Sequence, residues 1–260
     1  MKKLIALFCL ILLVLTVASS CGNDDAALKD IRDRGTLRVG VKTDVPGFGY
    51  YDSDTKKHEG LEIDLARLIA ADIFGNENAV EFIGVTAQTR GPMLENGELD
   101  MIIATFTITE ERKESYNFTE PYYHDEIGFL VRAESNIQNI SDINGKTVGI
   151  AQSGTAKSAL QSESERLGID VVYSERASYP ELKAALVAGE IDAFCVDKSI
   201  LTGYRDEKTR ILEEGFNPQD YGIATMLEKK QLAEYLDGFL DSIIKDGQFE
   251  KILIRWERVQ

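Results

Sequence analysis

The 260-residue sequence is poor in cysteine and histidine. Its three cysteines are Cys9, Cys21 and Cys195, and its two histidines are His58 and His124. Three thiols are too few to build a disulfide framework. The stability of the fold must therefore come from a buried core. The sequence also shows neither a cluster of metal-ligating residues nor a nucleophile paired with a base. These absences disfavour an enzyme, and we expect no cofactor and no metal.

Basic residues are scarce as well. The chain has 29 Lys and Arg against 44 Asp and Glu, which gives a net charge of −15. An acidic surface repels nucleic acid and anionic membranes. Because no basic patch with interleaved aromatics is visible, we expect no nucleic-acid partner. With 43% hydrophobic residues, the chain can bury a core for one large domain or two small ones.

The N-terminus has the pattern of an export signal. The positive segment Met1–Lys3 precedes the apolar run Leu4–Val17, which is too short for a comfortable membrane span. The small residues Ala18–Ser20 follow, and Cys21 comes next. This order resembles the bacterial lipoprotein signal, in which the cysteine is lipidated. The alternative is an ordinary secretory signal with a chance cysteine.

We therefore expect residues 1–20 to be a signal peptide and residues 21–27 a lipidated tether. The mature chain would carry a net charge of −17, because Lys2 and Lys3 are lost. The expected location is the periplasm or the outer face of the cytoplasmic membrane, with the lipid as the only membrane contact. Cys195 lies in an apolar run, where we expect a small buried side chain.

Two distant stretches of the chain share one pattern. Gly97–Asp100 (GELD) and Gly189–Asp192 (GEID) each follow a predicted helix and precede an apolar run. Thr105 stands five residues after the first aspartate, and Asp197 stands five residues after the second. In open α/β sheets, ligands bind outside the carboxyl ends of the strands. The pattern predicts two such strand ends that face each other across a cleft.

Strand and helix patterns alternate along the chain. They predict strands at 37–41, 80–83, 101–104, 147–150, 171–173 and 193–196, and helices at 61–74, 89–96, 155–167, 178–188, 229–245 and 248–258. Alternation implies two mostly parallel sheets, covered on both faces. The pattern restarts near residue 130, which predicts two lobes. Extended segments near 124–130 and 220–225 would cross between the lobes as a hinge.

Several motifs, taken in order, carry a family resemblance. They are Gly60–Ala66 (GLEIDLA), Asp100–Arg112 (DMIIATFTITEER), Phe118–Tyr123 (FTEPYY), Gly145–Thr155 (GKTVGIAQSGT), and Val196–Lys198 followed by Gln219–Ile223. Together they resemble the amino-acid-binding solute-binding proteins of bacterial ABC importers over nearly the whole mature chain. Lys42, Thr89–Pro92 and Val196–Lys198 look most like the branch that binds aspartate and glutamate.

This resemblance implies the two-lobe α/β fold of type II periplasmic binding proteins. Lobe 1 would hold residues 28–123 and 226–260, and lobe 2 would hold residues 124–225. The protein would be a monomer that captures glutamate or aspartate by lobe closure. It would deliver the amino acid to ABC permease subunits.

A bound amino acid needs partners for its α-carboxylate and its α-ammonium, because a lone buried charge is costly. By resemblance, Arg112 binds the carboxylate with help from Thr107, and Asp197 accepts the ammonium. Local spacing alone leaves two alternatives open. Arg112 could be a surface residue paired with Glu111 or Glu114, and Asp197 could cap the following helix.

The ligand's side chain is expected to meet Lys42 and Arg90. In the acidic-amino-acid branch both positions face the distal carboxylate, and Thr105 is a further hydroxyl donor. The alternatives are a solvated Lys42 and an Arg90 paired with a nearby glutamate.

Three more residues complete the predicted site. Phe48 is the expected aromatic against the ligand's stem, with plain core packing as its alternative. Ser153 and Thr155 open a helix whose N–H groups can take a carboxylate oxygen, and plain N-capping is compatible with that role.

Other functions remain open at this point. The chain could bind a neutral polar amino acid such as glutamine or asparagine, act as a dehydratase on the same fold, or report its ligand in a sensory or adhesive role. An enzyme would need a titratable group aimed at the ligand. His124 is the only histidine near the predicted cleft, whereas His58 lies in a polar loop and is expected to be solvated.

Overall fold

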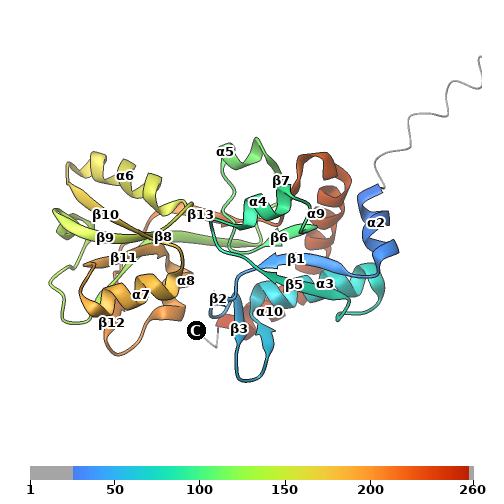
Figure 1. Ribbon diagram of the computed structural model, residues 1–260, viewed down its shortest axis with the longest axis horizontal. Coiled ribbons are helices and arrows are strands. Elements are labelled where there is room, and N and C mark those ends of the chain that lie inside the picture. The colour runs from blue at the N-terminus through green and yellow to red at the C-terminus, as the bar shows by residue number, and fades with distance from the viewer. Residues whose placement is uncertain (1–25, 258–260) are drawn as a thin grey trace, which may run out of the picture.

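The computed structural model describes residues 26–257 and has two lobes that lie side by side (Figure 1). Each lobe is a β-sheet with helices on both of its faces, and long extended segments join the lobes at the middle of the molecule. None of the helices in residues 26–257 combines the length and apolar composition that a membrane span requires.

Lobe 1 is built on a five-stranded sheet of order β5-β1-β6-β14-β7. β1 (Leu37–Val41) runs parallel to β5 (Val80–Gly84) and β6 (Met101–Ile103). β14 (Ala224–Met226) is antiparallel to β6 and to β7 (Tyr116–Phe118). The helices of this lobe are α2 (Ala26–Arg34), α3 (Leu61–Phe74), α4 (Arg90–Glu95), α5 (Glu110–Lys113), α9 (Lys230–Lys245) and α10 (Gln248–Glu257).

Lobe 2 repeats this plan with the strand order β10-β9-β11-β8-β12. β9 (Lys146–Ala151), β10 (Val171–Arg176) and β11 (Ala193–Asp197) are parallel. β8 (Tyr123–Arg132) runs antiparallel to β11 and to β12 (Thr209–Ile211). The helix α6 (Ala156–Leu167) covers one face, whereas α7 (Tyr179–Ala188) and α8 (Lys198–Tyr204) cover the other (Figure 1).

Two antiparallel strands form the hinge. β8 enters lobe 2, and β13 (Phe216–Tyr221) returns along it, with Tyr123 paired opposite Tyr221. Beyond Tyr221 the chain returns to lobe 1, where the N–H of Gly222 donates to the carbonyl oxygen of Phe106 and Ala224 pairs with Ile102. This return lies within the segment 220–225 that the sequence indicated as a crossing.

The sheets are mixed, although the sequence predicted mostly parallel ones. Three neighbouring strands at one end of each sheet are parallel, as the strand–helix alternation requires. The remaining strands are antiparallel because the chain enters lobe 2 on β8 and re-enters lobe 1 on β14.

At the N-terminus, α2 begins at Ala26, inside the expected tether 21–27. The signal peptide and Cys21 lie outside the described residues.

Local sequence signals explain most element boundaries. The helix predicted at 61–74 is confirmed as α3, and Gly75 ends it in the left-handed conformation with φ 68°. The capping signal at Ser178 is also confirmed, because its hydroxyl accepts the backbone N–H of Glu181. Cys195 is a fully buried residue of β11, as predicted.

A small hairpin sheet was not predicted from the sequence. It consists of β2 (Asp44–Val45), β3 (Gly49–Asp52) and β4 (Lys57–Glu59), which are too short to show alternation. Gly60 joins this sheet to α3 at φ 133°, and a Cβ there would lie 2.0 Å from the carbonyl oxygen of Phe48. Only glycine fits this junction. The close approach brings Phe48 and the first turn of α3 together at the cleft.

Candidate functional site

Polar residues follow three buried strands at the boundary between the lobes. In lobe 1, Lys42 follows β1, and Thr105 stands two residues beyond β6. In lobe 2, Asp197 is the last residue of β11. Lys42, Thr105 and Asp197 are 2%, 3% and 5% exposed, so all three are buried polar residues. The ends of strands from both lobes therefore bring buried polar groups to the boundary between the lobes.

Two arginines of lobe 1 stack on the ring of Phe106. The guanidinium carbon of Arg90 lies 4.2 Å from the ring centroid, and that of Arg112 lies 4.5 Å from it. Nη1 of Arg112 donates to the carbonyl oxygen of Thr107 at 2.7 Å. Burial and the neighbouring Arg90 lower the pKa of Arg112 to about 9, although the charge of Asp197 opposes that shift. The charges of Arg112 in lobe 1 and Asp197 in lobe 2 therefore interact across the boundary between the lobes.

Arg90 is buried at the start of α4. Its Nη1 donates to the carbonyl oxygens of Ala104 at 2.6 Å and Thr105 at 3.1 Å. Its Nε is buried without a hydrogen-bond partner among the described residues. Burial lowers the pKa of Arg90, and the charges of Asp197 and Glu62 oppose that shift. Backbone carbonyls hold this arginine in place, and Asp197 and Glu62 are its nearby acidic groups.

Lys42 contacts both lobes. Its Nζ lies 3.0 Å from a carboxylate oxygen of Asp44 and 4.6 Å from the ring centroid of Tyr179, which belongs to α7 of lobe 2. Burial lowers the pKa of Lys42, and Asp44 partly offsets that shift. The alternative of a solvated Lys42 is therefore wrong.

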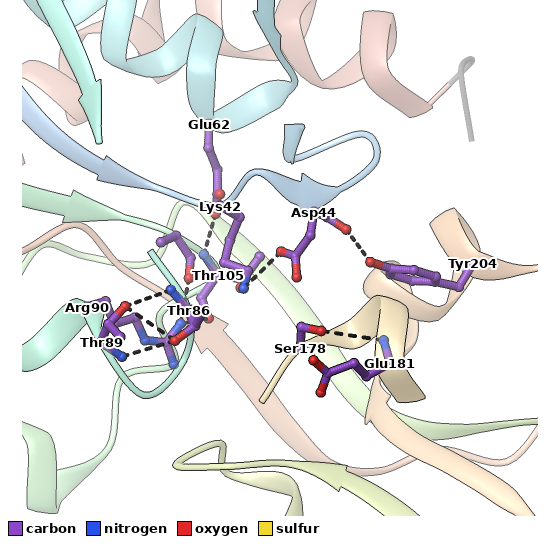
Figure 2. A network of polar contacts seen from close by, with 11 residues as sticks. Lys42, Asp44, Glu62, Thr86, Thr89, Arg90, Thr105, Ser178, Glu181 and Tyr204 are labelled. Atoms are coloured by element: carbon purple, nitrogen blue, oxygen red, sulfur yellow. Dashed lines mark hydrogen bonds and ion pairs between the residues drawn. The ribbon is translucent and has the colours of Figure 1, made fainter. Parts of the chain in front are cut away.

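Glu62 holds Thr105 in an unusual backbone conformation. Thr105 has a positive φ of 45°, which a β-branched residue adopts only under constraint. Oε1 of Glu62 accepts the N–H of Thr105 at 2.5 Å and the hydroxyl of Tyr122 at 2.6 Å. The hydroxyl of Thr105 is buried without a hydrogen-bond partner among the described residues. Figure 2 shows Glu62 directed from α3 toward Thr105 and Lys42.

Asp197 is held by the hinge. It accepts a short hydrogen bond from the hydroxyl of Tyr221, and that hydroxyl also lies 3.3 Å from Asp125. Burial raises the pKa of Asp197 to about 7, despite the hydrogen bond from Tyr221 and the nearby arginines. Asp197 stands at the N-terminus of α8, but its side chain makes no capping hydrogen bond. The alternative of a simple helix cap therefore does not apply.

Phe48 is 1% exposed and lies against the hinge aromatics. Its ring meets Tyr123 edge-on with centroids 4.9 Å apart, and it meets Tyr221 at 6.0 Å. Since Tyr221 also binds Asp197, Phe48 is placed beside the cleft and at the same time within the core. The position of Phe48 is compatible both with a contact to the ligand's stem and with plain core packing.

Gln219 connects the two lobes at the hinge. Its side-chain oxygen accepts hydrogen bonds from the hydroxyls of Thr107 in lobe 1 and Thr155 in lobe 2, both at 2.8 Å. Thr155 precedes α6 but makes no side-chain cap, so simple N-capping by Thr155 is wrong. Ser153 has a positive φ of 58° and is exposed.

The lobes are in contact around the cleft. The hydroxyl of Tyr204 in lobe 2 donates to the backbone oxygen of Asp44 in lobe 1, as Figure 2 shows. Gly203 packs so closely on Pro46 that an added Cβ would lie 3.1 Å from it. These contacts describe a closed arrangement, in which residues from both lobes bury the charged groups.

Two hollows differ in their relation to these residues. One of about 350 Å³ is lined by Arg90, Phe106 and Arg112 of lobe 1 and by Ser153 of lobe 2. A larger one of about 640 Å³ lies along α5, β7 and α9, and no predicted site residue lines it. We place the candidate site at the first, because both arginines line it and both lobes contribute to it. Lys42, Thr105 and Asp197 are not among the residues that line this hollow.

The sequence missed four residues of this cleft. Tyr179, Glu62, Gln219 and Tyr221 all contact predicted site residues. Glu62 and Gln219 lie inside quoted motifs, so their place in the sequence was a usable signal. Tyr179 follows the helix cap Ser178 and carries no pattern that separates it from a core tyrosine.

Among the described residues, the histidines contact groups other than the charged residues of the site. His58 packs between the rings of Tyr51 and Phe82, so the expectation of a solvated side chain is wrong. His124 is 76% exposed on the hinge and contacts Asp220, with Nδ1 and Oδ1 2.6 Å apart. In residues 26–257, no group of three or more His, Cys, Asp and Glu could hold a metal ion.

Two α/β lobes that close over buried cations and a buried carboxylate, on a two-strand hinge, define a solute-binding protein. The chain belongs to family 3 of the bacterial extracellular solute-binding proteins, which it matches over residues 37–259. Its fold is the type II periplasmic-binding-protein fold.

Individual relatives are similar over nearly the whole chain. An ABC-transporter glutamine-binding protein, GlnH of Bacillus subtilis, is 32% identical over 98% of this chain and 97% of its own length. The glutamate-binding protein GluB of Corynebacterium efficiens is 28% identical over 93% of this chain and 85% of its own. The solved structure of a cysteine-binding protein from Campylobacter jejuni has a TM-score of 0.79, with 28% identity over 88% and 92% of the two chains.

Proposed function

We propose that this chain captures an acidic amino acid, glutamate or aspartate, between its lobes and delivers it to the permease of an ABC importer. One observation carries the proposal. The buried cations Lys42 and Arg90 and the half-buried Arg112 come from lobe 1, and lobe 2 contributes the buried carboxylate of Asp197. An acidic amino acid offers two carboxylates and one ammonium, which this set can pair.

The α-groups of the ligand account for one cation and one carboxylate. Arg112 presents a planar fork that suits a carboxylate. Asp197 is a buried acceptor that has no cation in hydrogen-bond contact within residues 26–257. Because the two residues belong to different lobes, a zwitterion bound by both favours the closed arrangement. This differential affinity is what shifts a two-state equilibrium.

Hydrogen-bond donors support the acidic side chain. The Nε of Arg90 and the hydroxyl of Thr105 are buried without a hydrogen-bond partner among the described residues, and Lys42 adds an ammonium nearby. A distal carboxylate can accept from all three. Buried donors without an acceptor are costly, so the ligand supplies a stabilising group.

Glutamine is a second candidate. The relatives include a protein named for glutamine binding, and Asp44 beside Lys42 offers an acceptor for an amide N–H₂. The carboxylates of Asp44 and Glu62 also offset part of the positive charge that would otherwise favour an acid.

Replacing Arg90 tests the acidic side chain. We expect Arg90→Ala to reduce the affinity for glutamate and aspartate by about 30-fold or more, because a buried charge pair typically contributes about 2–5 kcal/mol. The affinity for glutamine and asparagine should fall by about severalfold at most. Isothermal titration calorimetry with the four amino acids measures this. Arg67→Ala is the matched control, because Arg67 also stacks on a phenylalanine of lobe 1 but lies away from the cleft. Equal loss for all four ligands would contradict the assignment.

Affinity should depend on pH through Asp197. Its pKa of about 7 should fall when a ligand ammonium binds, because a cation favours the ionised form. Binding then releases a proton, so affinity should level off near pH 8 and should fall by up to about tenfold per unit below about pH 6. Asp125, whose pKa burial also raises, acts in the same direction. Calorimetry from pH 5 to 8.5 measures the slope, which Asp197→Asn should largely remove.

We also propose that the chain is a monomer held at the membrane by a lipid on Cys21, and that it carries out no reaction of its own. The signal-like N-terminus supports export and lipidation. Mass spectrometry of the exported protein checks the lipid on Cys21, and an unmodified cysteine would contradict it.

A further inference from the structure

A carboxylate lies buried beneath the ligand-facing cations. Glu62, in the first turn of α3, is 0% exposed. Two donors, the N–H of Thr105 and the hydroxyl of Tyr122, point at its Oε1, while Oε2 has no hydrogen-bond partner among the described residues. Two donors and a helix N-terminus suit the ionised form. Burial raises the pKa of Glu62, whereas the donors, Arg90 and Lys42 oppose that rise.

A second carboxylate accompanies the other cation. Asp44 lies 3.0 Å from the Nζ of Lys42, with its side chain 17% exposed at the edge of the cleft. Arg90 makes its own hydrogen bonds to backbone carbonyls, so Glu62 compensates it through space rather than by direct contact. Each cation that faces the ligand's side chain therefore has a fixed acidic neighbour (Figure 2).

We propose that Glu62 and Asp44 are fixed counter-charges that set how strongly the cleft prefers a carboxylate over an amide at the end of the ligand's side chain. The inference rests on the proposed function and concerns the same cleft. With both carboxylates present, Lys42 and Arg90 are largely compensated before a ligand enters, which limits the advantage of an anionic side chain. Solvent screens charge interactions only weakly in a buried cleft. The charges of Glu62 and Asp44 therefore act on the ligand's side chain without direct contact.

Glu62 has a second, separable role as a positioning residue. The carboxylate of Glu62 accepts a hydrogen bond from the N–H of Thr105 and so supports the left-handed backbone at Thr105. That backbone conformation orients the hydroxyl of Thr105. It also orients the carbonyl oxygen of Thr105, to which Arg90 donates. Charge and position can be changed independently. Glu62→Gln removes the charge but keeps an oxygen acceptor of the same length, whereas Glu62→Asp keeps the charge but shortens the reach by one methylene.

The experiment compares glutamate and glutamine by calorimetry at pH 8 with the wild-type protein and single variants. We expect Glu62→Gln and Asp44→Asn each to raise the ratio of the glutamine Kd to the glutamate Kd by about tenfold or more. We expect Glu62→Asp to reduce the affinity for both ligands, while the ratio of the glutamine Kd to the glutamate Kd stays within about threefold of wild type. The control Glu81→Gln removes an exposed carboxylate of β5 in the same lobe and should leave the ratio unchanged.

The outcomes separate this inference from the proposed function. A ratio that Glu62→Gln and Asp44→Asn leave within twofold of wild type overturns the counter-charge role, and so does an equal loss of both ligands. If circular dichroism shows that Glu62→Gln does not fold, Asp44→Asn alone decides, because Asp44 lies at the cleft edge. Wild type that prefers glutamine contradicts the acidic assignment, while the direction of the ratio change still tests the counter-charges. Wild type that binds neither overturns both.

Discussion

Arg112→Ala should reduce the affinity for every amino acid by about 30-fold or more, toward the limit of calorimetric detection. The α-carboxylate is common to all amino acids, and the variant leaves it in a closed cleft without its two-pronged donor. Truncating one partner of a buried charge pair costs about 2–5 kcal/mol, which corresponds to roughly 30-fold to several thousandfold. The side chain of the ligand should make no difference to this loss.

A conservative variant separates charge from geometry. Arg112→Lys keeps a positive charge but loses the planar fork and part of the stacking on Phe106, so we expect an intermediate loss. Lys113→Ala removes the adjacent, exposed cation and should have little effect. If Arg112→Ala weakened only glutamate and aspartate, Arg112 would be a side-chain contact rather than the carboxylate anchor.

Asp197→Asn should produce a loss of similar size for a different reason. The ammonium of the ligand would enter a buried site with an amide in place of a carboxylate, and its charge would be unpaired. We expect the affinity to fall by about 30-fold or more at pH 8. Calorimetry measures this, and Asp170→Asn, on the exposed surface of lobe 2, is the control.

The same variant should stabilise the protein in the absence of ligand. The pKa of Asp197 is about 7 in the folded protein and near 3.8 when solvated, so its ionised form destabilises the fold. This cost is absent below about pH 3.8 and complete above about pH 7. Asp197→Asn should therefore raise Tm at pH 8 and raise it less at pH 5. A lower Tm together with weaker binding would instead indicate that Asp197 is a structural residue.

The architecture was largely predictable from local patterns. The parallel strands and the long helices were predictable because buried apolar runs and glycine helix ends are properties of adjacent residues, as at α3 and Gly75. The antiparallel strands and the small hairpin were not predictable. β14 is three residues long, and its partners β6 and β7 precede it by more than 100 residues, so pairing rather than propensity decides its direction.

The candidate site was predictable in part. The carboxyl ends of strands and the quoted motifs indicated Lys42, Thr105 and Asp197. The compensating groups could not be inferred in the same way, because they depend on approach in space. Glu62 reaches Thr105 across 43 residues, and Asp44, which meets Lys42, belongs to the β2–β3 hairpin that the sequence did not predict.

A crystal structure of the protein with L-glutamate tests the central claim most directly. We predict one glutamate between the lobes, with its α-carboxylate on the guanidinium of Arg112, its ammonium on the carboxylate of Asp197 and its distal carboxylate near Lys42 and Arg90. A ligand in the outer hollow along α5, β7 and α9, or one that contacts Arg112 but not Asp197, would contradict the account.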